Sequence, residues 1–382
     1  MARLGDIGQI ITGNTPKTAD IENYSSKDIA FIKPSDIQED RLTMLSRAEF
    51  YISEHAREKA RILAPGCILV TCIGIVGKVA INNIECAFNQ QINAIVPDLK
   101  KCDTKYIAYA IQSQQHRLQD IANAAVVPIL NKTQFSDIEI SLPPLDEQRH
   151  IAAVLDKVSG LIAKRWEQLR KLDELVKARF VEMFGDPVSN PYNWEKVSLS
   201  ELADIRIGPF GSLLHKEDYI EGGHPLVNPS HIIDRKIVID EKLTVSHQKY
   251  VELEAYHLKA GDVVMGRRGE MGRCAVVSQE DLLCGTGSLL IRPKGKVTAD
   301  YIQKIISFPS FKKMIEDMAV GQTMPNLNVP IVSAFQIIKP PVQVQENYYT
   351  FVTQVDKSKL TIRQSLDKLE VLKKALMQQY FG

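Results

Sequence analysis

Residues 32–37 of this 382-residue chain read IKPSDI, and residues 227–232, which lie 195 positions later, read VNPSHI. The same step of 195 links further pairs, namely Gly13 with Gly208, Leu63–Gly66 with Leu258–Gly261, Gly74 and Gly77 with Gly269 and Gly272, and Lys78 with Arg273. Later pairs fall at a step of 197, namely Leu130–Asn131 with Leu327–Asn328, Pro143–Pro144 with Pro340–Pro341, and Phe184–Gly185 with Phe381–Gly382. Such a repetition predicts that one structural unit is duplicated, with two residues inserted in the second copy.

Length and composition agree with a globular protein of two or three domains. Charged residues make up 24% and hydrophobic residues 45%, which excludes a largely disordered chain. The 47 Lys and Arg residues nearly balance the 46 Asp and Glu residues, so any nucleic-acid surface must depend on local placement. No apolar run suits a signal peptide or a membrane span. The six cysteines form no CxxC pair and no zinc-site spacing, so we expect buried thiols, no metal site and a cytoplasmic location.

The first part of each repeat has the pattern of an α+β domain. Short runs rich in Ile and Val, such as Cys67–Thr71 and Lys78–Ile81, are broken by Gly, Pro and Asn, which predicts strands and tight turns. A helix is expected after Asp103 and again after Thr298, because apolar residues then recur on one face. Asn131 and Asn328, just ahead of the double prolines, are expected to be structural.

The second part of each repeat predicts a long helix. Residues 147–184 contain no proline, and apolar residues recur there at alternating steps of four and three, as in a coiled coil. The expected coiled-coil and partner-docking residues are Ile151, Leu155, Val158, Ile162, Leu169, Leu172, Val352, Val355, Ile362, Leu366 and Leu369. Charged residues interrupt the two copies at different positions, so the helices should pair with each other. The expected boundaries are 1–145, 146–184, 185–341 and 342–382.

Sequence signatures of catalysis are absent. The chain has no GxGxxG, no Walker A loop and no HExxH motif. Ser189–Tyr192 reads SNPY and is similar to the NPPY motif of adenine methyltransferases, but no glycine-rich cofactor loop precedes it, so we interpret it as a turn. None of the eight histidines lies near a carboxylate pair or a cysteine at ligand spacing, so no catalytic residue is assigned.

Several segments resemble a known family. LPPLDEQRHIAAVLDKV at 142–158 is similar to the segment that opens the conserved helix in specificity (S) subunits of type I restriction-modification enzymes. Four more segments resemble the target-recognition domains of that family, namely TPK at 15–17, LAPGCILVTCIGIVGKVAI at 63–81, AFNQQINAIVP at 87–97 and GPFGS at 208–212. The resemblance covers essentially the whole chain. The second copy departs from it in one place, where Glu147-Gln148 becomes Gln345-Glu346.

The resemblance implies a non-catalytic subunit with two α+β target-recognition domains, each reading one half of a bipartite DNA site. Antiparallel helices would hold the domains apart and dock two methyltransferase subunits, and restriction subunits would join the assembly. The cofactors S-adenosylmethionine, ATP and Mg would then be bound by the partner subunits and not by this chain. No membrane partner is implied.

Candidate DNA-binding residues follow from the chemistry of base recognition, in which Arg and Lys pair with guanine and Asn and Gln with adenine. Arg267-Arg268-Gly269-Glu270-Met271-Gly272-Arg273 is the strongest candidate, because three arginines and two glycines share one short segment; the alternative is an exposed turn with salt-bridged arginines. The register equivalent, which ends at Lys78, is less basic. The other candidates are Asn14, Thr15, Lys17, Lys33, Ser35, Asn89, Gln90, Gln91, Ser212, Asn228, Ser230, His231, Thr286 and Ser288.

Two other functions are compatible with parts of the sequence. A coiled-coil adaptor whose globular domains bind proteins would explain the neutral charge and would have no affinity for DNA. A self-contained methyltransferase would need a cofactor loop, and binding of S-adenosylmethionine to the purified chain would reveal it. In the DNA-reading case, replacing Arg267 or Arg268 with alanine should weaken specific binding by about 1–3 kcal/mol and relax one half-site only.

Overall fold

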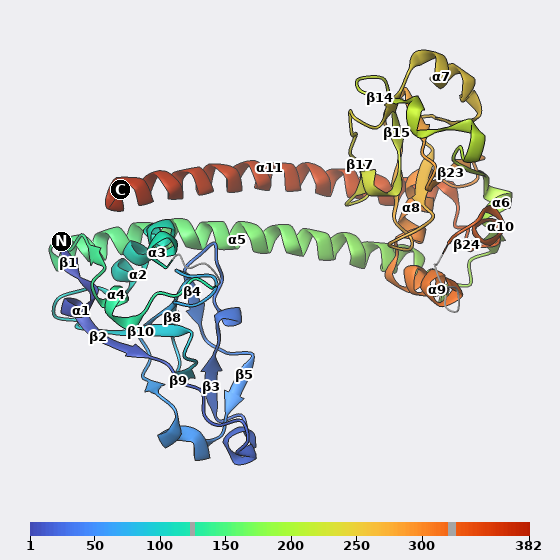
Figure 1. Cartoon of the computed structure of the whole chain (residues 1–382). Coiled ribbons are helices and arrows are strands. Elements are labelled where there is room, and N and C mark those ends of the chain that lie inside the picture. The colour runs from blue at the N-terminus through green and yellow to red at the C-terminus, as the bar shows by residue number, and fades with distance from the viewer. Residues whose placement is uncertain (123–126, 320–325) are drawn as a thin grey trace. The chain divides into compact units, whose positions relative to one another are not determined.

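The computed structural model describes residues 1–122, 127–319 and 326–382, and Figure 1 shows its elements. The chain divides into two compact units. Unit 1 combines Met1–Gln168 with Ile362–Gly382, and unit 2 is Leu169–Thr361. Each unit holds the strands and short helices of one repeat together with part of both long helices. The duplicated α+β architecture expected from the sequence is therefore confirmed.

Unit 1 is built on two small mixed sheets and a strand pair. Its strands are β1 (Ala2–Arg3), β2 (Gly8–Thr12), β3 (Ile29–Ile32), β4 (Thr43–Leu45), β5 (Phe50–Ile52), β6 (Ile62–Leu63), β7 (Ile68–Thr71), β8 (Val79–Asn82), β9 (Cys86–Phe88), β10 (Ile92–Pro97) and β11 (Glu139–Ile140). The sheet orders are β2-β10-β7-β8-β4 and β5-β3-β9-β6, and β1 pairs with β11. Its short helices are α1 (Leu4–Ile7), α2 (Thr104–Ser113), α3 (Gln115–Ile121) and α4 (Lys132–Ser136).

Unit 2 repeats this plan with small changes. Its strands are β12 (Lys196–Ser198), β13 (Ala203–Ile207), β14 (Tyr219–Ile220), β15 (His224–Val227), β16 (Ile232–Ile233), β17 (Lys236–Ile237), β18 (Thr244–Val245), β19 (His257–Leu258), β20 (Val263–Gly266), β21 (Cys274–Val276), β22 (Leu282–Cys284), β23 (Ser288–Pro293) and β24 (Gln336–Ile338). The order β13-β23-β20-β21 matches β2-β10-β7-β8, and β18-β15-β22-β19 matches β5-β3-β9-β6. Its short helices are α6 (Leu199–Leu202), α7 (His247–Glu252), α8 (Ala299–Ile306), α9 (Pro309–Ala319) and α10 (Val329–Ser333).

Short 3-10 helices connect the strands in both units. They are η1 (Ile21–Tyr24), η2 (Pro34–Asp36) and η3 (Glu54–Lys59) in unit 1, and η4 (Gly211–Leu213), η5 (Lys216–Asp218), η6 (Pro229–His231) and η7 (Glu254–Tyr256) in unit 2. The helices η2 and η6 begin in the two segments IKPSDI and VNPSHI. The repeated sequence thus forms the same local structure twice.

Two helices of 40 residues each, α5 (Leu145–Phe184) and α11 (Val342–Phe381), follow the double prolines. Every coiled-coil residue predicted above is buried or half-buried. In unit 1 the first turns of α5 and the last turns of α11 share one core, in which Ile151 and Leu155 lie with Leu376 and Tyr380. In unit 2 the Tyr348 hydroxyl donates to the Val176 carbonyl over 3.2 Å. The two helices therefore run antiparallel within each unit, and the unit boundaries cut through both of them.

Glycines at equivalent positions keep the two copies in the same conformation. Gly74 and Gly269 have φ values of +78° and +81°, which favour glycine because a Cβ is strained there. A Cβ on Gly208 would lie 1.9 Å from the Gly285 carbonyl oxygen, and one on Gly13 would lie 2.1 Å from that of Asn89. The repeated glycines thus mark turns and close backbone contacts and give no evidence of a ligand.

A buried glutamine joins each domain to its long helix. The Gln148 Oε1 atom accepts from the backbone N–H of Asp103 over 2.9 Å, and its Nε2 donates to the Pro143 carbonyl over 2.8 Å. Gln345 makes the same two contacts, to Thr298 N–H and to the Pro340 carbonyl. At the step of 197, Gln148 therefore matches Gln345. The departure expected at Glu147-Gln148 is therefore wrong, because the glutamine is present at the matching position of both copies. Only the glutamate differs, since Glu147 precedes Gln148 whereas Glu346 follows Gln345.

Several structural expectations are confirmed. Asp103 and Thr298 cap α2 and α8, and Asn131 and Asn328 accept from backbone N–H groups at the starts of α4 and α10. The SNPY segment is a turn in which the Asn190 side chain bonds both backbone groups of Trp194. The six cysteines are buried thiols. Among the helices of the described residues, none has the length and apolar character to cross a membrane.

Candidate nucleic-acid interface

Three segments converge at the equivalent place in each unit. They are the 3-10 helix η2 or η6, the loop after β7 or β20, and the turn before β10 or β23. In unit 1 the Lys78 ammonium donates to the carbonyls of Pro34 and Ile37 over 2.9 and 3.0 Å. In unit 2 the Arg273 guanidinium donates to the Pro229 carbonyl over 3.2 Å and also binds Glu270. Lys78 and Arg273 were predicted to bind DNA, but in the structure they link the segments of the site to one another.

Arg267 is also occupied within the protein. Its Nε–H donates to the Leu327 carbonyl over 3.0 Å, and its backbone N–H donates to Gly287. Burial lowers the pKa of its guanidinium, and neighbouring Arg268 adds to the effect. The backbone of Cys72 makes the equivalent contacts to Gln91 and Leu130 in unit 1. Arg267 is thus mainly a structural link between the loop and the segment before α10.

Arg268 remains the strongest candidate for base recognition. Its side chain is exposed and, within the part of the chain that the structure describes, has no hydrogen bond or ion pair. It precedes Gly269 near the start of the loop after β20. In the matching loop of unit 1, Arg268 corresponds to the half-buried Ile73, and the exposed side chain is that of Ile75, with half of its surface accessible. An exposed isoleucine can contact the methyl group of thymine, a possibility that a search for basic residues misses.

Other predicted residues lie at the surface around these loops. The exposed ones are Thr15, Lys17, Ser35, Gln90, Ser230 and Thr286. Thr15 donates to the side-chain oxygen of Gln90 over 2.6 Å, which fixes the orientation of both side chains. Ser35 and Ser230 occupy the same position in η2 and η6. The structure therefore brings Thr15 and Gln90, which come from separate segments of unit 1, into direct contact.

The remaining predicted residues have contacts within the protein. Ser288 is fully buried and donates to the Val227 carbonyl, so its hydroxyl is not available to a base. His231 and Asn89 are 7% and 8% exposed, and their side chains form hydrogen bonds with neighbouring groups. Asn14 uses both side-chain atoms on the backbone of Lys59 and Arg61. Lys33 lies over the ring of Phe50, and Asn228 and Gln91 are half-buried. The side chain of Ser212 lies outside the described residues.

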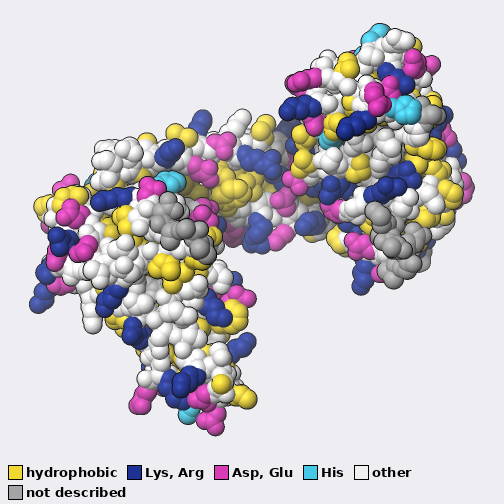
Figure 2. Space-filling view, in the orientation of Figure 1, with side chains coloured by type: hydrophobic (Ala, Val, Ile, Leu, Met, Phe, Trp, Pro, Cys, Tyr) yellow, Lys and Arg dark blue, Asp and Glu magenta, His cyan; other side chains and the backbone are white. Residues whose placement is uncertain are grey.

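Charge on the surface of the molecule is mixed. Figure 2 shows Lys and Arg side chains interspersed with Asp and Glu on the visible face of the molecule. The structure adds one basic feature that the sequence prediction missed, a pocket in unit 2 lined by lysines and arginines from α5, the β16–β17 turn, α8 and α9. Its residues come from distant parts of the sequence, so no local motif could have indicated it.

Comparisons with known proteins agree with this architecture. The model of the type I restriction modification DNA specificity domain matches residues 1–171 and again residues 191–372. The specificity subunit of the type I restriction enzyme MjaIX of Methanocaldococcus jannaschii is 23% identical, over 98% of this chain and 90% of that protein.

Two solved structures share the fold over almost the whole chain. One is the S subunit of a type I restriction-modification system from M. genitalium, with a TM-score of 0.58 and 14% identity over 100% of this chain and 95% of that one. The other comes from a study of complex assembly in a type I restriction-modification system, with a TM-score of 0.62 and 17% identity over 99% and 96%. The chain belongs to the type I restriction-modification DNA specificity family and carries the specificity domain twice.

Proposed function

We propose that each repeated domain of this specificity subunit reads one half of a bipartite DNA site. The observation that carries the proposal is the contrast between a repeated framework and unlike exposed side chains. Equivalent glycines, helix caps and buried glutamines hold both domains in one conformation, while the matching loops expose Arg268 in one copy and Ile75 in the other. The two half-sites should therefore differ in sequence.

The long helices are proposed to dock two methyltransferase subunits. The predicted seam residues from Ile151 to Leu369 are buried or half-buried in the helix pairs, so they are not the docking surface. The helices instead expose other large apolar side chains, namely Leu161, Trp166, Leu175, Val181, Leu360, Val371 and Leu372. Apolar side chains exposed in such number are typical of a surface that a partner covers.

The subunit itself is proposed to be non-catalytic. On this proposal S-adenosylmethionine is bound by the methyltransferase subunits, and ATP and Mg by the restriction subunits. The chain contributes the choice of DNA sequence.

An exchange of one domain tests the proposal. The chain is co-expressed with its methyltransferase subunit in a host without other DNA methyltransferases, and the methylated motif is determined by sequencing. Replacing residues 186–341 with the equivalent domain of another family member should change one half of the motif and leave the other. An unmethylated genome, from a complex that assembles normally, would favour the adaptor function and contradict the proposal.

A further inference from the structure

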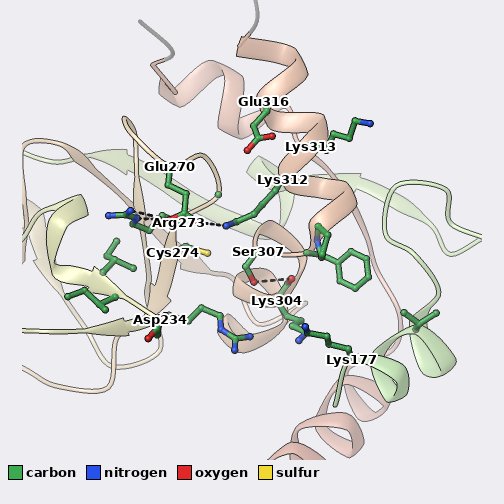
Figure 3. Close-up of a pocket in the computed structure, with 17 residues that line it drawn as sticks. Lys177, Asp234, Glu270, Arg273, Cys274, Lys304, Ser307, Lys312, Lys313 and Glu316 are labelled. Atoms are coloured by element: carbon green, nitrogen blue, oxygen red, sulfur yellow. Dashed lines mark hydrogen bonds and ion pairs between the residues drawn. The ribbon is translucent and has the colours of Figure 1, made fainter. Parts of the chain in front are cut away.

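Unit 2 contains a pocket of about 780 Å³ with an unusual balance of charge (Figure 3). Six basic side chains line it, from Lys177, Arg235, Arg273, Lys304, Lys312 and Lys313, against three acidic ones, from Asp234, Glu270 and Glu316. These residues come from the end of α5, the β16–β17 turn, the loop after β20, α8 and α9. The pocket is therefore built by tertiary structure and lies wholly within one unit.

One acidic residue neutralises part of this charge. Glu270 accepts from Lys312 over 2.5 Å and from Arg273 over 3.1 Å, as Figure 3 shows. Within the described residues, no carboxylate pairs with Lys177, Arg235, Lys304 or Lys313. The nearby carboxylate of Asp173 is already bound to Lys359 over 2.6 Å. Four cationic groups thus line the pocket without an ion pair among the described residues, although the carboxylates of Asp234 and Glu316 also line it.

Lys304 is the deepest of these four groups. It lies on the α8 helix among the buried residues Tyr301, Ile302 and Ile305, and its ammonium is 5.7 Å from the centre of the Phe180 ring. Burial, together with the weaker effect of the positive charges of Arg235, Lys177 and Lys359, lowers its pKa to about 8, against a smaller opposite effect of Asp173. A half-buried lysine among other cations is costly to the fold, so an anion that entered the pocket would be held strongly.

Unit 1 has a pocket at the equivalent place but without the excess of positive charge. It is lined by Glu39, Asp40 and Glu370 together with Arg41, Lys373 and Lys374. Asp40 takes the position of Arg235 and Gln115 that of Lys312, whereas Tyr109, which matches Lys304 in sequence, lines a neighbouring pocket. The matching loops also pack alike on these residues. A Cβ on Gly77 would lie 2.9 Å from the Gln115 side chain in unit 1, and one on Gly272 would lie 2.9 Å from the Lys312 side chain in unit 2. The basic pocket is therefore a property of the second copy and not of the shared framework.

We propose that this pocket of unit 2 binds a backbone phosphate of the DNA beside the half-site that unit 2 reads. The inference rests on the proposed function and names a contact within it. Lys304, Arg235 and Lys177 would surround the phosphate, with Lys313 at the rim. Such a contact would fix the position of the domain on the duplex, while base recognition would come from the adjacent loop.

The neighbouring loop favours DNA over an acidic protein partner. Glu270 and Arg273, which line the pocket, belong to the loop that also presents Arg268 to solvent only two residues earlier. A strand whose bases are read by Arg268 would therefore pass the pocket. Lysine binds phosphate as a point charge, and a pocket of this volume can accept a sugar-phosphate segment. A partner protein docking alike on both copies would instead call for similar pockets in the two units.

Salt dependence of binding tests this inference. The full chain is assembled with its methyltransferase subunits, and its affinity for a short duplex carrying the methylated motif is measured by fluorescence anisotropy over a range of salt. Lys304→Met and Arg235→Asp should each weaken binding about tenfold and reduce the salt slope by about one. Lys374→Gln, at the position in unit 1 that matches Lys177, should leave both quantities unchanged.

A pH series provides a second, independent readout. Binding a phosphate should return the Lys304 pKa toward its ordinary range, so the complex takes up a proton. Wild-type affinity should therefore fall about tenfold between pH 7 and pH 9, whereas Lys304→Met should show no such fall.

The outcomes are distinguishable. Unchanged affinity and salt slope in variants of an active complex would overturn the pocket assignment and leave the proposed function intact. Variants that lose assembly with the methyltransferase, while the remaining complex binds DNA normally, would show a protein-docking pocket and also overturn it. If the wild-type complex failed to bind the duplex at all, the proposed function itself would fail.

Discussion

The two units use one framework but present different surfaces. Gln148 and Gln345 make the same pair of backbone contacts, and Lys78 and Arg273 both hold the carbonyl of the proline that begins a 3-10 helix. The exposed side chains beside these contacts are unlike, with Arg268 and Arg235 in unit 2 against Ile75 and Asp40 in unit 1. The side chains that hold the framework together and those that face solvent are thus different residues of neighbouring segments.

The largest expected effect concerns the shared framework. Gln345→Leu removes the partner of the Thr298 N–H and the Pro340 carbonyl, and each buried group left unpaired costs about 1–3 kcal/mol. We expect thermal or urea unfolding to show a loss of about 3 kcal/mol, with the same loss for Gln148→Leu. The exposed neighbour Glu346→Gln serves as the control and should be neutral. Unequal losses in the two glutamine variants would break the equivalence of the two copies.

The next largest effect distinguishes the roles of the adjacent residues Arg267 and Arg268. Arg268→Ala should weaken specific DNA binding by about 1–3 kcal/mol without changing stability, because its guanidinium has the exposure that base contact requires. Arg267→Ala should instead lower stability, since it removes the bond to the Leu327 carbonyl. Anisotropy and urea unfolding of the same two variants provide the comparison. Equal effects of both variants on DNA binding at unchanged stability would show that Arg267 also contacts DNA.

Lys304 should show a cost to stability that depends on pH. Its pKa of about 8 in the folded protein lies below the ordinary 10.5, so the cost is present in full below pH 8 and fades as pH rises toward 10.5. Lys304→Met should therefore be more stable than wild type by about 1 kcal/mol at pH 7, with a smaller gain at pH 10. Thermal unfolding at the two pH values measures the difference. A variant that is less stable at pH 7 would show that Lys304 supports the fold.

The smallest effect is expected at the ion pair between the long helices in unit 2. Lys359 is largely buried, but Asp173 is 58% exposed, so water screens much of their attraction. Asp173→Asn should cost less than about 1 kcal/mol in the free energy of unfolding. A double-mutant cycle with Lys359→Met isolates the coupling between the two charges. A coupling energy several times larger would show that this charge pair, and not the apolar seam, determines helix pairing.

The sequence predicted most of the framework. The step of 195 identified the glycines that now show positive φ, and the steps of four and three predicted α5 and α11 because a seam leaves a periodic pattern. Gln148 and Gln345 were misaligned, because the pair Glu147-Gln148 was compared with Gln345-Glu346 at a step of 198, one residue beyond the step of 197 that holds there. Repetition therefore revealed the fold better than it revealed individual contacts.

The candidate site was less predictable, because composition does not show where a side chain points. Lys78, Arg267 and Arg273 have the chemistry of base recognition but donate to backbone carbonyls inside the protein. Ser288 has a hydroxyl that could bond a base, yet it begins a strand whose first four residues are all buried. The basic pocket draws its residues from five separate segments, and their meeting is determined only by the tertiary fold.

The methylated motif of Arg268→Ala tests most directly the claim that two unlike readers share one framework. The variant is co-expressed with the methyltransferase subunit, and the motif is compared with that of wild type by sequencing of methylated DNA. We predict a bipartite motif for wild type and, for the variant, a relaxed base in one half with the other half unchanged. A motif that relaxes in both halves, or one that does not change at all, would contradict the account.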